Sequence, residues 1–88
     1  MQKRMRYLRL KHNISMPELS AHSTVSKQRL SQIELEEEAG SKQLTEMLEK
    51  TFYRMIENRR SRLAALEFDF NLHRKHLLDF VPKGEEIS

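Results

Sequence analysis

Residues 15–34, SMPELSAHSTVSKQRLSQIE, constrain this chain more than any other segment because they have the spacing of two short helices joined by a tight turn. Ser15 is expected to cap the first helix, since Glu18 follows three residues later in a capping-box arrangement and Pro17 suits a first helical turn. Ser26 is expected to cap the second helix. Such a unit mainly serves to hold its second helix against another molecule.

The rest of the chain also favours helix, so the predicted fold class is all-α. Two glycines and two prolines in 88 residues, abundant Leu, Glu, Lys, Arg and Met, and no alternating β-branched stretch leave no competing signal for strands. A first helix is expected over residues 2–12, with Met5, Leu8 and Tyr7 facing inward. It should stop at Asn13, because Asn tolerates the left-handed conformation at a helix end.

Several classes of protein are excluded by what the sequence lacks. Without cysteine there is no disulfide framework and no thiolate zinc site, so metal fingers are excluded. No apolar run approaches the roughly 20 residues needed to cross a bilayer, and the basic start MQKRMR leads into an amphipathic pattern instead of a signal peptide. We therefore expect a cytoplasmic protein with no membrane partner.

Catalytic and cofactor motifs are also missing. The chain has no Gly-rich phosphate loop, nucleophile elbow or HExxH sequence, which indicates a protein that is not an enzyme and needs no cofactor. His73 and His76 stand at i, i+3 and could in principle share a metal ion. Because no cysteine or converging acid cluster accompanies them, no metal site is predicted.

Positive charge is concentrated toward the N-terminus. Residues 1–34 hold seven basic side chains against two acidic ones, whereas residues 35–50 hold five acids and two lysines. This polarity suits a polyanionic partner, since phosphate neutralisation and counterion release supply most non-specific affinity for DNA. The alternative is a solvated basic face with no partner.

The second half of the chain carries a heptad pattern. From Ser41, a further candidate cap, to Val81 there is no Gly or Pro, which permits either one long helix or two. Within this stretch nine positions alternate in spacing between four and three residues, as in a coiled coil. They are Phe52, Ile56, Arg59, Leu63, Leu66, Phe70, His73, Leu77 and Phe80.

This pattern predicts a homodimer. The expected interface is the seam without Arg59, namely Phe52, Ile56, Leu63, Leu66, Phe70, His73, Leu77 and Phe80, and the polar positions Arg59 and His73 could fix its register. The alternative is a helical hairpin or bent helix that folds back within a monomer. The predicted organisation is a head at 1–50, a long dimerisation helix at 51–81 and a disordered tail at 82–88.

Four elements of the pattern together resemble one known family. They are Arg9, then Ser15-Met16-Pro17-Glu18-Leu19-Ser20, then Thr24-Val25-Ser26, and finally Leu30-Ser31-Gln32-Ile33-Glu34. In this order and spacing the chain resembles the lambda-repressor-like, or Xre/Cro-type, helix-turn-helix family over about residues 5 to 52. The resemblance implies a head of four to five helices whose second motif helix enters the DNA major groove.

The resemblance also assigns roles to individual residues. It implies an ion pair between Arg9 and Glu34. Base contacts would come from Lys27, Gln28, Arg29 and Gln32, and phosphate contacts from Ser15, Ser26 and Ser31. The chemistry agrees, because Gln matches adenine N6 and N7 while Lys and Arg donate to guanine O6 and N7.

Three departures from the family pattern accompany the match. Thr24 replaces the usual turn glycine, which would be strained if that turn requires positive φ. Met16 and Pro17 replace residues that commonly begin the first motif helix. An acidic run, Glu36-Glu37-Glu38, follows the second motif helix, where it would either face away from DNA or bind a protein.

The function expected from this sequence is specific binding of double-stranded DNA. The resemblance implies a bacterial or mobile-element transcriptional regulator, most simply a repressor, that binds an inverted-repeat operator as a homodimer. The alternative is an antitoxin-like or adaptor-like module that binds another protein through the long helix and the acidic loop, with DNA binding secondary.

Overall fold

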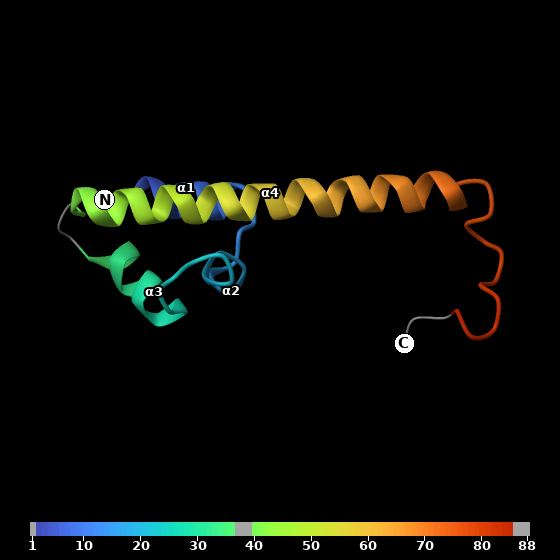
Figure 1. The fold of residues 1–88 in the computed structure, drawn as a ribbon, viewed down its shortest axis with the longest axis horizontal. Helices are drawn as coiled ribbons and strands as arrows, with labels where there is room; N and C mark the ends of the chain where they lie inside the picture. The colour runs from blue at the N-terminus through green and yellow to red at the C-terminus, as the bar shows by residue number, and fades with distance from the viewer. Residues whose placement is uncertain (1, 37–39, 86–88) are drawn as a thin grey trace.

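The chain folds as a small helical head carried on one long helix (Figure 1). The computed structural model describes residues 2–36 and 40–85, and those two ranges contain no strand. Its helices are α1 (Arg4–Lys11), α2 (Met16–Ser20), α3 (Lys27–Leu35) and α4 (Lys42–His73). The molecule measures 55 × 21 × 20 Å because α4 projects well beyond the other helices.

Serine caps begin three of the helices, as predicted. The hydroxyl oxygen of Ser15 accepts a hydrogen bond from the Glu18 amide at 3.1 Å, that of Ser26 from the Arg29 amide at 3.1 Å, and that of Ser41 from the Leu44 amide at 3.2 Å. Each bond satisfies an amide that a helix start would otherwise leave without a partner.

The turns that join α1, α2 and α3 need no glycine. Asn13 has φ of 54°, which confirms the predicted left-handed stop after α1. It is the sole non-glycine with positive φ in the described ranges, so Thr24 occupies its turn without the strain that a positive φ would bring. Thr24 is therefore compatible with the conformation of this turn.

The core of the head lies between the three short helices and the first half of α4. Its buried members are Met5, Ile14, Leu19, Leu30, Ile33 and Met55, and Leu44, Met47, Leu48 and Phe52 of α4 pack against them. The predicted inward positions of Leu8 and Tyr7 are wrong, since these side chains are 40% and 50% exposed. Met5 and Arg9, one turn apart, occupy the inner face of α1 instead and leave Leu8 at its margin.

The helix α4 settles the question of one helix or two, because it runs unbroken from Lys42 to His73. The predicted boundary at residue 50 falls inside it, and its core contacts continue to Met55. It stops eight residues before Val81, so Leu77 and Phe80 lie outside any helix, contrary to the heptad prediction. The residues after His73 form turns instead, in which the His76 amide donates to the His73 carbonyl at 2.8 Å and the Asp79 amide donates to the His76 carbonyl at 3.0 Å.

Two predicted segments lie partly or wholly outside the described residues. In the acidic run only Glu36 is described, at the end of α3, while Glu37 and Glu38 are not. Of the predicted tail, residues 86–88 are not described, and the preceding residues form a turn in which the Glu85 amide donates to the Pro82 carbonyl at 3.0 Å. No described helix combines the length and apolar character that crossing a membrane requires.

Candidate nucleic-acid interface

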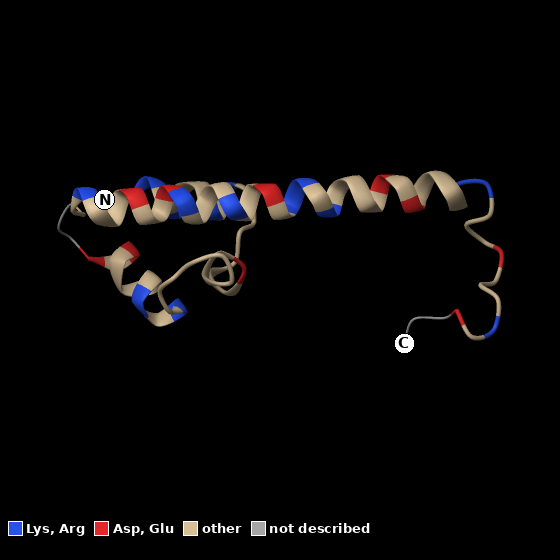
Figure 2. Cartoon of the chain, viewed as in Figure 1, with Lys and Arg blue, Asp and Glu red and all other residues tan. Residues whose placement is uncertain are grey.

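The exposed half of α3 carries the polar side chains assigned to base contacts. Lys27, Gln28, Arg29 and Gln32 are exposed, whereas Leu30 and Ile33 on the other face are 0% and 2% exposed. The helical period of 3.6 residues places Gln28 and Gln32 opposite Leu30 and Ile33, whereas Lys27 and Arg29 flank that face in the first turn of α3. Figure 2 shows the basic residues of α3 near the start of the helix, at its end away from α4.

The start of α3 also suits an anion. Ser26 is exposed, its hydroxyl oxygen accepts from the Arg29 amide, and its hydroxyl hydrogen has no acceptor within the described residues. The first amides of a helix have no partner within the helix, and the helix dipole favours negative charge there. Ser15 is likewise exposed at the start of α2, whereas Ser31 is half-buried on the flank of α3.

The guanidinium of Arg29 forms an ion pair with a carboxylate at the end of the same helix. Its guanidinium Nη1 lies 3.2 Å from Oε1 of Glu36 at the end of α3, and both side chains are nearly half exposed. An exposed pair of this kind contributes only about 0 to 1 kcal/mol, so a phosphate could displace Glu36. Among the four assigned base-contact residues, Lys27, Gln28 and Gln32 have no such ion pair or side-chain hydrogen bond within the described part of the chain.

A buried ion pair fixes α3 in the head. The Arg9 guanidinium donates to both carboxylate oxygens of Glu34, from Nε at 3.0 Å and from Nη2 at 2.8 Å, as the family resemblance implies. The Glu34 side chain is 3% exposed and that of Arg9 is 12% exposed. Arg9 also donates to the Ile14 carbonyl, and Lys3 donates to the Ile33 carbonyl near the end of α3.

A second ion pair, which the sequence pattern did not reveal, ties α2 to α4. Arg59 donates to both oxygens of Glu18 at 2.7 Å, and it also donates to the carbonyls of His12 and Asn13 at 2.9 and 3.1 Å. Arg59 was assigned to the heptad seam, where it would fix register. Its guanidinium instead forms hydrogen bonds within the head. The capping-box position of Glu18 did not indicate that its partner would lie 41 residues away.

This pair makes stability depend on pH. The hydrogen bonds from Arg59 lower the pKa of Glu18 from its ordinary value, against the opposing effect of burial, and they raise the pKa of Arg59. Because the folded pKa of Glu18 lies below the unfolded one, the stabilisation is complete above about pH 4.3 and is lost as pH falls through the folded value.

Glu18→Gln should reduce the loss of unfolding free energy at acid pH, the acid limb, in a series of urea denaturations at different pH values. Glu57→Gln serves as the exposed control. An unchanged acid limb would show that the pair contributes nothing.

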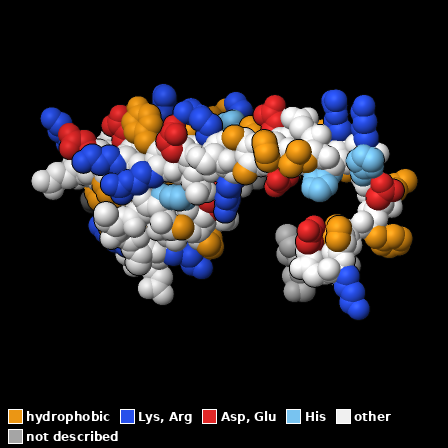
Figure 3. Space-filling view, turned by 45° about the vertical axis from the view of Figure 1, so that its right-hand side comes forward, with side chains coloured by type: hydrophobic (Ala, Val, Ile, Leu, Met, Phe, Trp, Pro, Cys, Tyr) orange, Lys and Arg blue, Asp and Glu red, His pale blue; other side chains and the backbone are white. Residues whose placement is uncertain are grey.

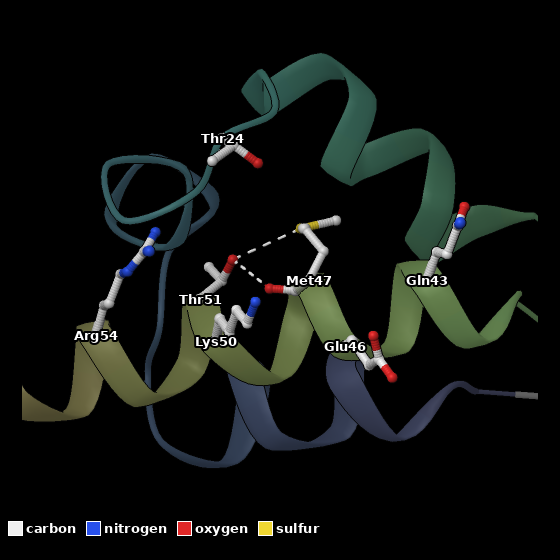
Figure 4. A pocket seen from close by; sticks show the side chains of 7 residues that line it. All are labelled: Thr24, Gln43, Glu46, Met47, Lys50, Thr51 and Arg54. Atoms are coloured by element: carbon white, nitrogen blue, oxygen red, sulfur yellow. Dashed lines mark hydrogen bonds between the residues drawn. The ribbon is translucent and has the colours of Figure 1, made fainter.

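A shallow groove of about 300 Å³ lies between the α2–α3 connection and α4. Figure 4 shows Thr24 on the connection facing α4, where Lys50 and Arg54 lie on successive turns. Both basic side chains are exposed and form no ion pair within the described residues. At the floor of the groove the Thr51 hydroxyl donates to the Met47 carbonyl at 2.9 Å. Glu46 also lines the groove, so its charged side chains are two basic ones and one acidic one.

No protein-family model, curated protein or solved structure matches this chain. The candidate site is accordingly assigned from its own chemistry. No group of three or more His, Asp or Glu side chains in the described ranges is placed to hold a metal ion. The surface offers hydrogen-bond donors, amide groups and positive charge on a rigidly held helix.

Proposed function

We propose that this protein binds specific sequences in double-stranded DNA, with α2 and α3 forming a helix-turn-helix of the lambda-repressor-like type. The observation that carries the proposal is the exposed side of α3, where Gln28 and Gln32 lie one turn apart opposite the buried Leu30 and Ile33, with Lys27 exposed at the start of the helix. An α-helix fits the DNA major groove, and these side chains are the types that read guanine and adenine there.

Positioning on the DNA backbone would come from groups around the start of α3. The free hydroxyl hydrogen of Ser26 and the first amides of α3 can donate to phosphate oxygens. Lys50 and Arg54 lie on the side of the α2–α3 connection and add long-range attraction. Such contacts carry no sequence information but set the register in which Gln28 and Gln32 meet the bases.

We further propose that the protein acts as a homodimeric transcriptional regulator of bacteria or mobile elements, in the cytoplasm. Repression would follow from occupation of a promoter. A two-fold symmetric dimer would require an inverted repeat in the operator.

Chemical-shift mapping tests where DNA binds, without knowledge of the operator. On addition of a mixed-sequence duplex to the isotope-labelled protein, the largest amide shifts should fall at residues 26–32, with smaller ones at Lys50 and Arg54. Residues 60–73 serve as the internal control and should move little. Shifts confined to residues 60–81, or none at all, would contradict the proposal.

A second candidate function is binding of another protein, as in an antitoxin or adaptor. The observation that favours it is the set of exposed apolar side chains on α4 beyond the head and in the segment after it. Under this alternative DNA would bind weakly and without preference for sequence, so titration of a selected duplex against scrambled DNA separates the two candidates.

A further inference from the structure

Methionine supplies all the sulfur in this chain, which has five methionines and no cysteine. All five lie within the first 55 residues, so the hydrophobic side chains that Figure 3 shows along the projecting part of α4 include none of them. Peroxides convert the methionine thioether to a polar sulfoxide, and a reductase can reverse the change. Oxidation of sulfur would therefore act on the head.

Burial separates the methionines of the head. Met5 and Met55 belong to the core, with exposed fractions of 8% and 1%, whereas Met16 and Met47 are half-buried and pack against the edge of the core. Met47 also lines the groove of about 300 Å³ between the α2–α3 connection, residues 21–26, and α4. Since one water molecule occupies about 30 Å³ in the liquid, a small peroxide can enter this groove and reach the Met47 side chain.

Two hydroxyl groups lie beside the Met47 sulfur, Sδ. Ser23 Oγ and Thr51 Oγ1 are both 3.6 Å from it. Figure 4 shows the Met47 side chain rising from α4 toward the connection, with Thr51 one turn further along the helix. Thr51 donates its hydroxyl hydrogen to the Met47 carbonyl at 2.9 Å. Ser23 Oγ accepts from the Val25 amide at 3.1 Å, so its own hydrogen is left to point at the sulfur.

We propose that Met47 is a site of reversible oxidation and that the Ser23 hydroxyl holds the sulfoxide. A thioether sulfur accepts hydrogen bonds only weakly, whereas the added oxygen of a sulfoxide is a polar acceptor. An oxygen added to Sδ on the side of Ser23 comes within hydrogen-bond distance of Oγ, about 2.5 to 3.0 Å, without movement of the connection. The bond that joins the connection to α4 would then become stronger.

The reaction requires a peroxide as oxidant, and hydrogen peroxide is the probe. A lone pair on Sδ attacks one peroxide oxygen, the O–O bond breaks, and the second oxygen leaves as water after taking the proton of the first. Sulfur loses two electrons and the peroxide gains them. In the reverse reaction two thiols become one disulfide, the thioether is restored, and the oxygen leaves as water.

A donor at this place decides how much the oxidation costs the fold. A polar oxygen in a half-buried position destabilises a protein unless a hydrogen bond satisfies it. With Ser23 present, the Met47 sulfoxide has its donor and the head should stay folded. Without the Ser23 hydroxyl, the same sulfoxide should open the contact between the connection and α4.

The rate of oxidation tests whether Met47 is a reactive site. Full-length protein is treated with hydrogen peroxide, and the added oxygen is located at intervals by mass spectrometry of proteolytic peptides. Met47 should be oxidised at least about tenfold faster than Met5 or Met55, because these two are buried. In concentrated urea the three rates should become equal. If Met47 in the folded protein reacts as slowly as Met55, the proposal is wrong.

The role of Ser23 is tested by urea denaturation before and after oxidation. The background is Met16→Leu, which removes the other half-buried methionine. Oxidation should raise the unfolding equilibrium constant by less than about threefold in this background and by at least about tenfold when Ser23→Ala is added. Comparing each variant with its own reduced form cancels what Ser23→Ala costs by itself. Equal changes with and without Ser23 would overturn its role.

Met47→Leu is the matched control, since leucine keeps the apolar volume but has no sulfur to oxidise. Peroxide treatment of this variant should leave its unfolding curve unchanged, and a change equal to that of the parent would place the effect at another methionine. Methionine sulfoxide reductase with a thiol should remove the added oxygen from Met47, and an oxygen that stays would contradict reversibility. None of these experiments contains DNA, so their outcome is independent of the proposed function.

Discussion

A variant in which Lys27, Gln28 and Gln32 are all alanine is expected to lose its preference for a selected duplex over a scrambled one by about 100-fold or more. Each good base contact discriminates by about 1 to 3 kcal/mol, and all three side chains are exposed in the first two turns of α3. Fluorescence anisotropy with both duplexes at constant salt measures the ratio. The residual affinity should remain steeply salt-dependent, since the phosphate contacts are kept.

Two controls make this result specific to base recognition. The triple variant should unfold at the same urea concentration as the wild type, because none of the three side chains enters the core. Gln2→Ala changes an exposed glutamine before α1, outside α3, and should leave the specificity ratio unchanged. If the triple variant keeps full specificity, α3 is not the helix that reads the bases.

Arg9→Ala is expected to lower the free energy of unfolding by about 3 to 5 kcal/mol. The change leaves the Glu34 carboxylate, whose side chain is 3% exposed, without the two charged hydrogen bonds that hold it, and it also removes the bond to the Ile14 carbonyl. A domain of this size has little stability to spare, so the variant should be largely unfolded at 37 °C. Urea denaturation at 10 °C followed by circular dichroism gives the value.

Arg6 provides the matched control for this prediction. Its guanidinium lies 3.9 Å from the same Glu34 carboxylate, but its side chain is 41% exposed. Arg6→Ala should therefore cost less than about 1 kcal/mol. The double variant Arg9→Met with Glu34→Leu should recover much of the lost stability, because it removes the buried charge with its partner. Equal losses for Arg6→Ala and Arg9→Ala would refute the role given to Arg9.

Local features of this fold, such as helix caps, were predictable from the sequence. Contacts between residues far apart in the chain were harder to predict. The serine caps and the stop at Asn13 depend on residues within a few positions of one another, which a sequence displays directly. The bond between Arg59 and Glu18 joins residues far apart and depends on how α2 approaches α4. The heptad pattern placed Arg59 correctly on the helix but could not show that its guanidinium forms hydrogen bonds with residues of the head.

The end of α4 illustrates a different limit. The spacing of apolar residues continues to Phe80, so periodicity alone predicts helix to that point. The helix ends at His73 and turns follow it, although the apolar spacing goes on, so periodicity does not mark this end. Similarly, the short α1 has room for only one inward stripe, which Met5 and Arg9 fill, so Leu8 and Tyr7 remain outside the core.

The measurement that tests the central claim most directly is selection of bound sequences from a random duplex pool at physiological salt, followed by titration of the selected duplex against scrambled DNA. The account predicts an enriched inverted repeat, bound at least about 1,000-fold more tightly than scrambled sequence. No enrichment, or only weak binding that disappears as salt is raised, would contradict it and favour the protein-binding alternative.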